Sequence, residues 1–201
     1  MSPAEASAVV DWRRHVHALY AEVRRLSARG QAEEAHSRWR TVRDELFGSH
    51  PASPVRDRSG LHGLPTAAYD PTWRLTAEVQ PGDGHRIVVP TGTDGEVTLL
   101  RLGTVELDRI GGLDVWWHAG YGGGLFLPLR DGLAGSRTYG GGRYLLDTAK
   151  GADLGSEGRR IVIDLNFAYN PSCAYDPMWA CPLAQPGNVT AAEVPVGELM
   201  A

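Results

Sequence analysis

The sequence predicts an α+β fold that is mainly β, with an antiparallel β-barrel or sandwich following an N-terminal helical hairpin. Apolar residues recur every three or four positions over residues 8–47, which is the spacing of amphipathic helices. From residue 73 onward, short apolar and β-branched runs alternate with glycine-rich turns, a pattern typical of short strands. No crossover helices fit between these runs, so the pattern disfavours a parallel sheet.

The composition is that of an ordinary globular protein. The chain has 201 residues, of which 42% are hydrophobic and 22% charged, and its formal net charge is −4. Such a length fits one core of about 100–200 residues, and the hydrophobic content disfavours a disordered chain. Because the chain has neither a basic excess nor an acidic tail, we expect no nucleic-acid partner.

The N-terminal segment lacks the features of a signal peptide. Residues 1–8 contain no basic residue and no long apolar run. Elsewhere, no apolar run approaches the roughly 20 residues that cross a bilayer. We therefore expect a cytoplasmic protein with no membrane partner.

Two helices are expected over residues 8–47. Gly30 is expected to interrupt the helical pattern, and a second helix then runs from about Gln31 to Leu46. The two would form a hairpin or a bent arm. One face of the first helix carries the apolar residues Val9, Trp12, Val16, Leu19, Tyr20, Val23 and Leu26.

A breaker-rich segment, residues 47–54, separates the helices from the rest of the chain. We divide the chain into residues 1–70, a helical arm and connector, and residues 71–201, an antiparallel β body with an extended C-terminal tail. The expected strands of the body are Trp73–Val79, Arg86–Pro90, Val97–Arg101, Thr104–Asp108, Leu113–His118, Leu125–Arg130, Gly142–Thr148 and Arg160–Phe167.

The segment from Leu125 to Leu183 contains the most distinctive phrases of the chain. It begins Leu-Phe-Leu-Pro-Leu-Arg-Asp, continues with Tyr-Gly-Gly-Gly-Arg-Tyr and Asp-Leu-Asn-Phe-Ala-Tyr-Asn-Pro-Ser-Cys-Ala-Tyr, and closes with Cys-Pro-Leu. In these phrases the chain resembles the bacterial and archaeal family catalogued as domain of unknown function 1684. The resemblance implies a β-rich fold and supplies no activity.

Polar side chains on the last two expected strands form a candidate ligand-binding site. Strand alternation places Arg143 and Asp147 on one face, and Asp164 and Asn166 on one face of the next strand. Consecutive strands usually pair, so we expect these groups to converge. An arginine can hold a carboxylate, and an aspartate can take a proton. The structural alternative is that Arg143 only neutralises Asp164 or Asp147 in a buried ion pair.

The loop after the last strand adds polar and aromatic groups. Pro171 and Pro177 make this loop rigid, and rigid loops often hold binding groups. Its alternative role is to fasten the tail to the body. The complete candidate ligand-binding set is Arg143, Tyr144, Asp164, Asn166, Tyr169, Asn170 and Tyr175.

The leading hypothesis is a small-molecule-binding β-barrel whose ligand carries an anionic group. Whether it is an enzyme stays open, and we expect neither a cofactor nor a metal. One alternative is a non-catalytic interaction module that forms a homodimer through the helical arm, with Trp12 and Trp39 in the interface. The other is a metal protein that uses Cys173, Cys181 and His118. Free thiols or a disulfide are further states open to the two cysteines.

Overall fold

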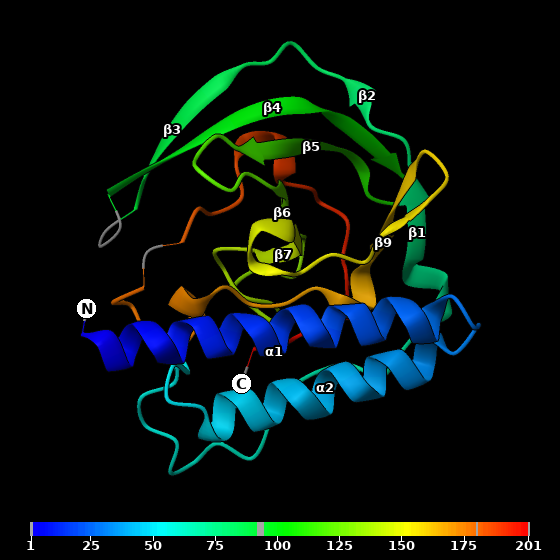
Figure 1. Cartoon of the computed structure of the whole chain (residues 1–201). Helices are drawn as coiled ribbons and strands as arrows, with labels where there is room; N and C mark the ends of the chain where they lie inside the picture. The colour runs from blue at the N-terminus through cyan, green and yellow to red at the C-terminus, as the bar shows by residue number, and fades with distance from the viewer. Residues whose placement is uncertain (1, 92–94, 180, 201) are drawn as a thin grey trace.

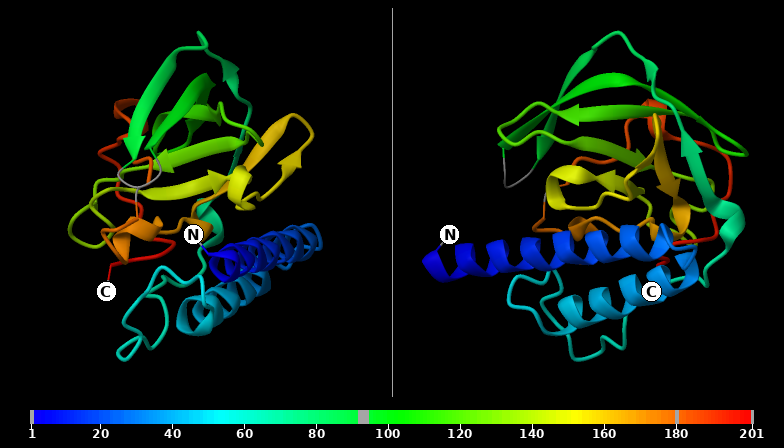
Figure 2. Two further views of the ribbon diagram at one scale, coloured as in Figure 1. Left: turned by 60° about the vertical axis from the view of Figure 1, so that its left-hand side comes forward. Right: turned by 45° about the vertical axis from the view of Figure 1, so that its right-hand side comes forward.

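Two helices and a set of antiparallel strands make up the chain (Figure 1). The computed structural model describes residues 2–91, 95–179 and 181–200. The helices α1 (Pro3–Ser27) and α2 (Ala32–Ser49) pack side by side as a hairpin along one side of the β body, as Figures 1 and 2 show. The predicted α+β class is therefore confirmed.

The ends of the helices follow from local chemistry. Ser2 caps α1, because its hydroxyl accepts the backbone N–H of Glu5 while the Glu5 carboxylate accepts the backbone N–H of Ser2. Gly30 turns the chain between the helices at a φ of 78°, a left-handed conformation that glycine adopts most easily. Neither helix, over the described residues, is long and apolar enough to cross a membrane.

The apolar face of α1 packs against the chain's own β body. Leu19 and Val23 are buried there in one hydrophobic cluster with Ile163 of the smaller sheet. The indole N–H of Trp39 on α2 donates to the Tyr20 hydroxyl at 3.2 Å, which joins the two helices. Helices and sheets therefore share one core. The body covers the C-terminal half of the apolar stripe, whereas Val9, Trp12 and Val16 are only half-buried.

The larger sheet has six strands in the order β2-β4-β5-β6-β7, with β3 also paired to β4. The predicted strands 97–101 and 104–108 are one long strand, which bends at a bulge between Arg101 and Gly103. A Cβ at Gly103 would lie 1.9 Å from the Gln80 carbonyl oxygen, so the bend requires glycine. The strands are β2 (Gln80–Pro81), β3 (Arg86–Thr91), β4 (Gly95–Leu107), β5 (Gly111–His118), β6 (Leu125–Leu129) and β7 (Arg143–Asp147).

The smaller sheet corrects the predicted strand pairing. We expected β7 to pair with β9, but Arg143 of β7 lies opposite Leu129 of β6, and Asp164 of β9 lies opposite Arg74 of β1. Between β7 and β9 the chain forms a 3₁₀ turn and the short strand β8 instead of a direct return, so β9 joins the other sheet. In sheet order, the strands are β1 (Arg74–Ala77), β9 (Arg160–Asp164) and β8 (Ser156–Glu157).

Strand β9 also ends earlier than the predicted strand 160–167. The Asp164 carboxylate accepts the backbone N–H of Asn166 at 3.0 Å and starts the 3₁₀ helix η3 (Leu165–Phe167). The alternation of faces therefore does not extend to Asn166. The other 3₁₀ helices are η1 (Pro71–Trp73), η2 (Thr148–Lys150), η4 (Ser172–Ala174) and η5 (Pro186–Asn188).

Of the two predicted arrangements, a barrel or a sandwich, the closed barrel is not observed over the described residues. Among the described residues, the six-stranded and the three-stranded sheet have separate strand orders, and neither closes on itself. The strands instead form open antiparallel sheets stacked above the helices in Figure 1.

The C-terminal segment runs as extended chain along the body. The backbone N–H of Arg130 donates to the Asn188 carbonyl at 2.9 Å. The buried Asn188 side chain donates to the carbonyls of Asp114 and Pro128 at 2.8 and 3.0 Å, and accepts the Trp116 indole N–H at 2.8 Å. These bonds satisfy a buried amide completely and fix the path of the tail.

Candidate functional site

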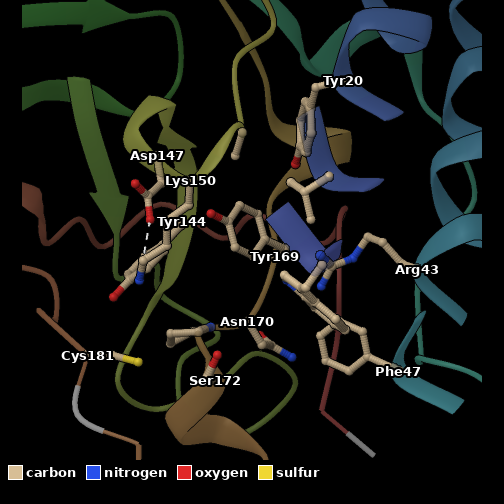
Figure 3. Close-up of a pocket in the computed structure, with 14 residues that line it drawn as sticks. Tyr20, Arg43, Phe47, Tyr144, Asp147, Lys150, Tyr169, Asn170, Ser172 and Cys181 are labelled. Atoms are coloured by element: carbon tan, nitrogen blue, oxygen red, sulfur yellow. Dashed lines mark ion pairs between the residues drawn. The ribbon is translucent and has the colours of Figure 1, made fainter. Parts of the chain in front are cut away.

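A cavity of about 90 Å³ lies where the helical hairpin meets the body (Figure 3). Both helices, the end of β7 with η2, and the loop after η3 form its walls. Helix α1 comes very close to η2, since a Cβ at Gly151 would lie 3.0 Å from the His17 imidazole. The lining residues are Trp12, Val16, Tyr20, Arg43, Phe47, Tyr144, Asp147, Lys150, Ala152, Tyr169, Asn170, Pro171, Ser172 and Cys181.

Tyr169 stands at the centre of the site. Its backbone exchanges two hydrogen bonds with Tyr144 of β7, at 2.9 and 3.1 Å, which fixes the loop against the sheet edge. The two rings meet edge to face with centroids 5.7 Å apart. In Figure 3 the Tyr169 hydroxyl points towards Asp147 and Lys150, while Arg43 lies on the opposite side.

Arg43 of α2 brings a buried guanidinium to the cavity. Its Nε donates to Oε1 of Glu198 at 2.7 Å, and its Nη2 donates to the same oxygen. The guanidinium carbon lies 5.0 Å from the Tyr169 ring centroid and 4.9 Å from that of Phe47. Burial alone would lower the pKa of Arg43, but the Glu198 carboxylate raises it, so the group stays charged. Within the described chain, Nη1 makes no hydrogen bond.

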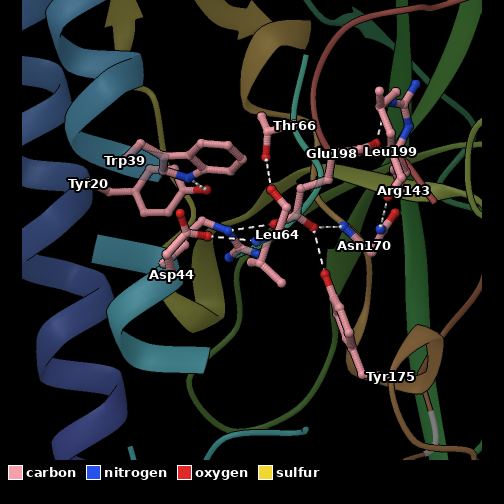
Figure 4. Close-up of polar contacts among 11 residues, drawn as sticks. Tyr20, Trp39, Asp44, Leu64, Thr66, Arg143, Asn170, Tyr175, Glu198 and Leu199 are labelled. Atoms are coloured by element: carbon pink, nitrogen blue, oxygen red, sulfur yellow. Dashed lines mark hydrogen bonds and ion pairs between the residues drawn. The ribbon is translucent and has the colours of Figure 1, made fainter. Parts of the chain in front are cut away.

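Glu198 joins three segments behind this wall (Figure 4). Besides pairing with Arg43, it accepts the backbone N–H of Asn170 at 2.7 Å and the Tyr175 hydroxyl at 2.9 Å. Burial, followed by the nearby Glu198 charge, raises the pKa of Tyr175 well above its ordinary value. Tyr175, one of the predicted ligand-binding residues, therefore supports the site from behind and does not line the cavity.

Asp147 supplies the opposite side of the cavity. It is 2% exposed, and its Oδ1 has no hydrogen-bond partner among the described residues. The Nε2 atom of His118 lies 3.9 Å from Oδ1, and the Nζ atom of Lys150 lies 3.9 Å from Oδ2. Both distances exceed hydrogen-bonding range. Burial lowers the pKa of His118, so that imidazole is mostly neutral at pH 7.

Arg143 does not reach the cavity. Its fully buried guanidinium donates to the carbonyls of Val194 and Glu198 at 2.9 and 3.0 Å, and also to that of Val196. Its carboxylate partner is Asp131, at 2.8 Å, and neither Asp147 nor Asp164. Arg143 thus forms a buried ion pair, but with a different carboxylate from the two expected, and it fastens the C-terminal tail to β7.

Asp164 and Asn166 also lie outside the cavity lining. The Asn166 side-chain amide donates to the Asp70 carbonyl at 2.8 Å and accepts the Asp70 backbone N–H at 2.9 Å. It thus pairs with Asp70 as a neighbouring strand would. The Tyr69 hydroxyl lies 3.4 Å from Asp164. Burial raises the pKa of Asp164 to about 6. These two residues tie the connector to β9, and the expected convergence with Arg143 does not occur.

Three of the predicted site residues line the cavity: Tyr144, Tyr169 and Asn170. The Oδ1 atom of Asn170 has no hydrogen-bond partner in the part of the chain that the structure describes. Sequence reasoning missed the contribution of the helices, Arg43 above all. One signal was present, because Arg43 follows Trp39 at helical spacing and so lies on the apolar face of α2.

The two cysteines lie next to each other at the rim. Both are free and partly exposed, and Cys181 belongs to the cavity wall. A hydrogen bond from the Cys173 thiol lowers the pKa of Cys181 to about 6, and the same contact raises the pKa of Cys173. The Tyr139 hydroxyl lies 3.7 Å from the Cys173 sulfur.

The proposed metal set of Cys173, Cys181 and His118 does not assemble. Among the described residues, a spacing suited to a metal ion occurs only at Asp11, His15 and His50. The His50 Nδ1 accepts the Ala52 backbone N–H at 3.0 Å, so its Nε2 carries the proton and donates to Asp11. That imidazole is therefore not free to bind a metal.

The fold and the cavity define an α+β protein with a small, aromatic-walled site between a helical hairpin and antiparallel sheets. Residues 59–199 match the model of the family described as Protein of unknown function (DUF1684), so the chain belongs to this family, as its phrases predicted. No curated protein matches the chain. Both helices precede the matched segment, so Arg43 and the α1 wall lie outside it.

A solved structure shows the same fold. The chain is similar to an uncharacterised protein from the gene locus rrnAC0354 of Haloarcula marismortui, whose structure was determined by solution NMR. The identity is 31% and the TM-score 0.57, and the match covers 85% of this chain and 96% of the archaeal one.

Proposed function

We propose that this protein binds a small polar organic molecule through a carboxylate or a similar oxygen-bearing group. The binding site is the cavity between the helical hairpin and the body. The observation that carries the proposal is the guanidinium of Arg43, which is held in place by Glu198 and still has Nη1 unpaired within the described residues. An arginine of this kind is a ready donor for a ligand oxygen.

The rest of the wall has the composition of a ligand site. Aromatic rings from Trp12, Tyr20, Phe47 and Tyr169 supply most of the apolar surface, and a few polar groups interrupt it. Buried polar atoms are normally hydrogen-bonded, yet the Oδ1 atom of Asn170 lacks a partner in the described chain. A ligand that donates to this oxygen would complete its hydrogen bonding.

The size of the cavity limits the ligand. At about 30 Å³ for each water molecule, a cavity of about 90 Å³ holds the equivalent of about three waters. The ligand is therefore a very small molecule, or one that inserts a single polar end. Lys150, with 60% of its side chain exposed, lies at the open rim.

Ligand binding is the function that this geometry supports best. Among the described lining residues, no serine or cysteine is hydrogen-bonded to a histidine, as an activated nucleophile would be. A homodimer through the helical arm has less support, because the C-terminal half of the apolar face of α1 packs on the body.

The test fills the cavity without removing a charge. Val16 of α1 lines the cavity, and Val10 lies on the same helix with 45% of its surface exposed. We expect acetate, titrated into labelled protein, to shift the NMR signals of the Arg43 side chain and of Asn170. Val16→Trp should abolish these shifts, whereas the control Val10→Trp should keep them. Equal shifts in both variants, or none in the natural protein, would refute the proposal.

A further inference from the structure

Asp147 is a buried carboxylate with one oxygen, Oδ1, that makes no hydrogen bond among the described residues. It is the last residue of β7 and stands at the start of η2, where an aspartate normally caps the first turn. Its side chain makes no capping hydrogen bond, and Oδ1 has no hydrogen-bond partner among the described residues. A carboxylate that is 2% exposed is stable only when it is paired, so this one lacks a partner that the ligand can supply.

The charged groups that face Asp147 form only long ion pairs with it, without a hydrogen bond among the described residues. From β5, His118 is 3.9 Å away and is mostly neutral at pH 7 because burial lowers its pKa. From η2, Lys150 is also 3.9 Å away, and its largely exposed ammonium is screened by water. From β7 and the following loop come the phenols of Tyr144 and Tyr169, which carry no charge.

On the opposite side of the cavity, the charged group already has a close partner of opposite charge. Arg43 is in direct contact with Glu198, so the positive charge there is already compensated. Asp147 therefore leaves the cavity with an unmatched negative end, next to a row of aromatic rings. Aromatic faces attract cations, and tyrosines beside a carboxylate are a common setting for an ammonium group.

We propose that Asp147 binds the ammonium group of the ligand, so that the ligand is a small zwitterion with an amino group at one end and a carboxylate at the other. This inference rests on the proposed function, which places the carboxylate at Arg43. The ammonium donates to Oδ1 of Asp147 and lies against the rings of Tyr144 and Tyr169. Lys150 then acts as a competitor, because its own ammonium approaches the same carboxylate.

A metal ion is a poorer partner for this carboxylate. Divalent ions need several oxygen, nitrogen or sulfur ligands around one point. Over the described residues, no cluster of histidine, cysteine or acidic ligand atoms gathers at Asp147. One carboxylate between aromatic rings suits a single ammonium group instead.

The experiment compares a zwitterion with its two halves. β-Alanine, acetate and methylammonium chloride are titrated separately into labelled full-length protein, and NMR shifts give each affinity. We expect β-alanine to bind more tightly than acetate or methylammonium. Asp147→Asn should weaken β-alanine about 10-fold or more, the usual effect of losing a hydrogen bond to a charged group. Acetate affinity should not fall, because the substitution removes a like charge from the cavity.

Matched variants separate the possible failures. Asp108→Asn removes the same charge from an exposed position and should leave β-alanine affinity unchanged. Lys150→Met keeps Asp147 and removes its competitor, so β-alanine should bind more tightly. If acetate binds but Asp147→Asn and Lys150→Met leave β-alanine affinity unaltered, Asp147 is not an ammonium site and only the carboxylate site stands. If no probe shifts the cavity signals, the proposed function itself is wrong.

Discussion

Arg43 on α2 and Glu198 near the C-terminus form a buried ion pair although 155 residues separate them in the sequence. Glu198 also receives the Asn170 backbone N–H and the Tyr175 hydroxyl. One carboxylate therefore holds the helical hairpin, the loop after η3 and the C-terminal tail in register. The shape of the cavity depends on this contact.

Removing the carboxylate of Glu198 should strongly destabilise the folded protein. Glu198→Ala leaves the guanidinium of Arg43 buried without a partner, and breaking a buried pair in this way costs about 3–5 kcal/mol. We expect that loss in the free energy of unfolding measured by urea denaturation. Glu193→Ala, an exposed position in the same tail, should change it by less than about 0.5 kcal/mol. Similar values for the two variants would contradict the role of the pair.

Substitution of Arg143 should loosen the C-terminal tail and leave the affinity for the ligand unchanged. In Arg143→Met, the Asp131 carboxylate and three tail carbonyls lose their donor. We expect faster amide hydrogen exchange over residues 194–198, with acetate affinity unchanged in the folded protein. The exposed Arg137→Met serves as the control. Loss of acetate binding with a normally protected tail would instead restore Arg143 as a ligand-binding residue.

The free energy of unfolding should decrease as the pH rises, because Asp164 then loses its proton. Its pKa is about 6 in the folded protein, above the value of about 3.9 in an unfolded chain. The folded state therefore holds this proton more tightly, and the resulting stability is fully present below pH 3.9 and lost as the pH rises through 6. The effect is of the order of 2–3 kcal/mol at most.

Asp164→Asn tests this dependence because it keeps the shape and removes the titrating group. Comparing urea unfolding at pH 4 and pH 7 should show that the substitution stabilises the protein at pH 7 relative to pH 4. An identical pH dependence in the natural protein and in Asp164→Asn would show that this carboxyl is not responsible.

Cys181 should be the more reactive of the two thiols. Its pKa of about 6 depends on the hydrogen bond from Cys173, so its thiolate should dominate at neutral pH. We expect alkylation by iodoacetamide to label Cys181 first, with a rate that rises around pH 6. In Cys173→Ala the midpoint should move upward. A midpoint that stays in place would mean that another group sets the acidity.

Local patterns account for the parts that the sequence predicts well. The helical spacing of Leu19 and Val23 correctly indicates a buried helix face. The glycine-rich turns lie at the ends of most strands. Tyr169 and Asn170, which line the cavity, lie in one rigid and distinctive phrase of the sequence. All of these signals lie within a few residues of each other.

What the sequence could not predict depends on distant contacts. The partner of β9 is β1 and not β7, because the turn at η2 redirects the chain, and no periodicity encodes that direction. The pairing of Arg43 with Glu198, and of Arg143 with Asp131, is likewise decided by the packed fold. The predicted set therefore shares its loop residues Tyr169 and Asn170 with the cavity, whereas the arginine that lines the cavity is Arg43 and not Arg143.

The most direct test measures where a bound carboxylate lies. Intermolecular nuclear Overhauser effects between the methyl protons of acetate and the protein should appear at the rings of Tyr169 and Phe47, which flank Arg43. Val16→Trp should remove them. Contacts that appear only at residues outside this cavity, or that persist in Val16→Trp, would show that the hollow between hairpin and body is not the binding site.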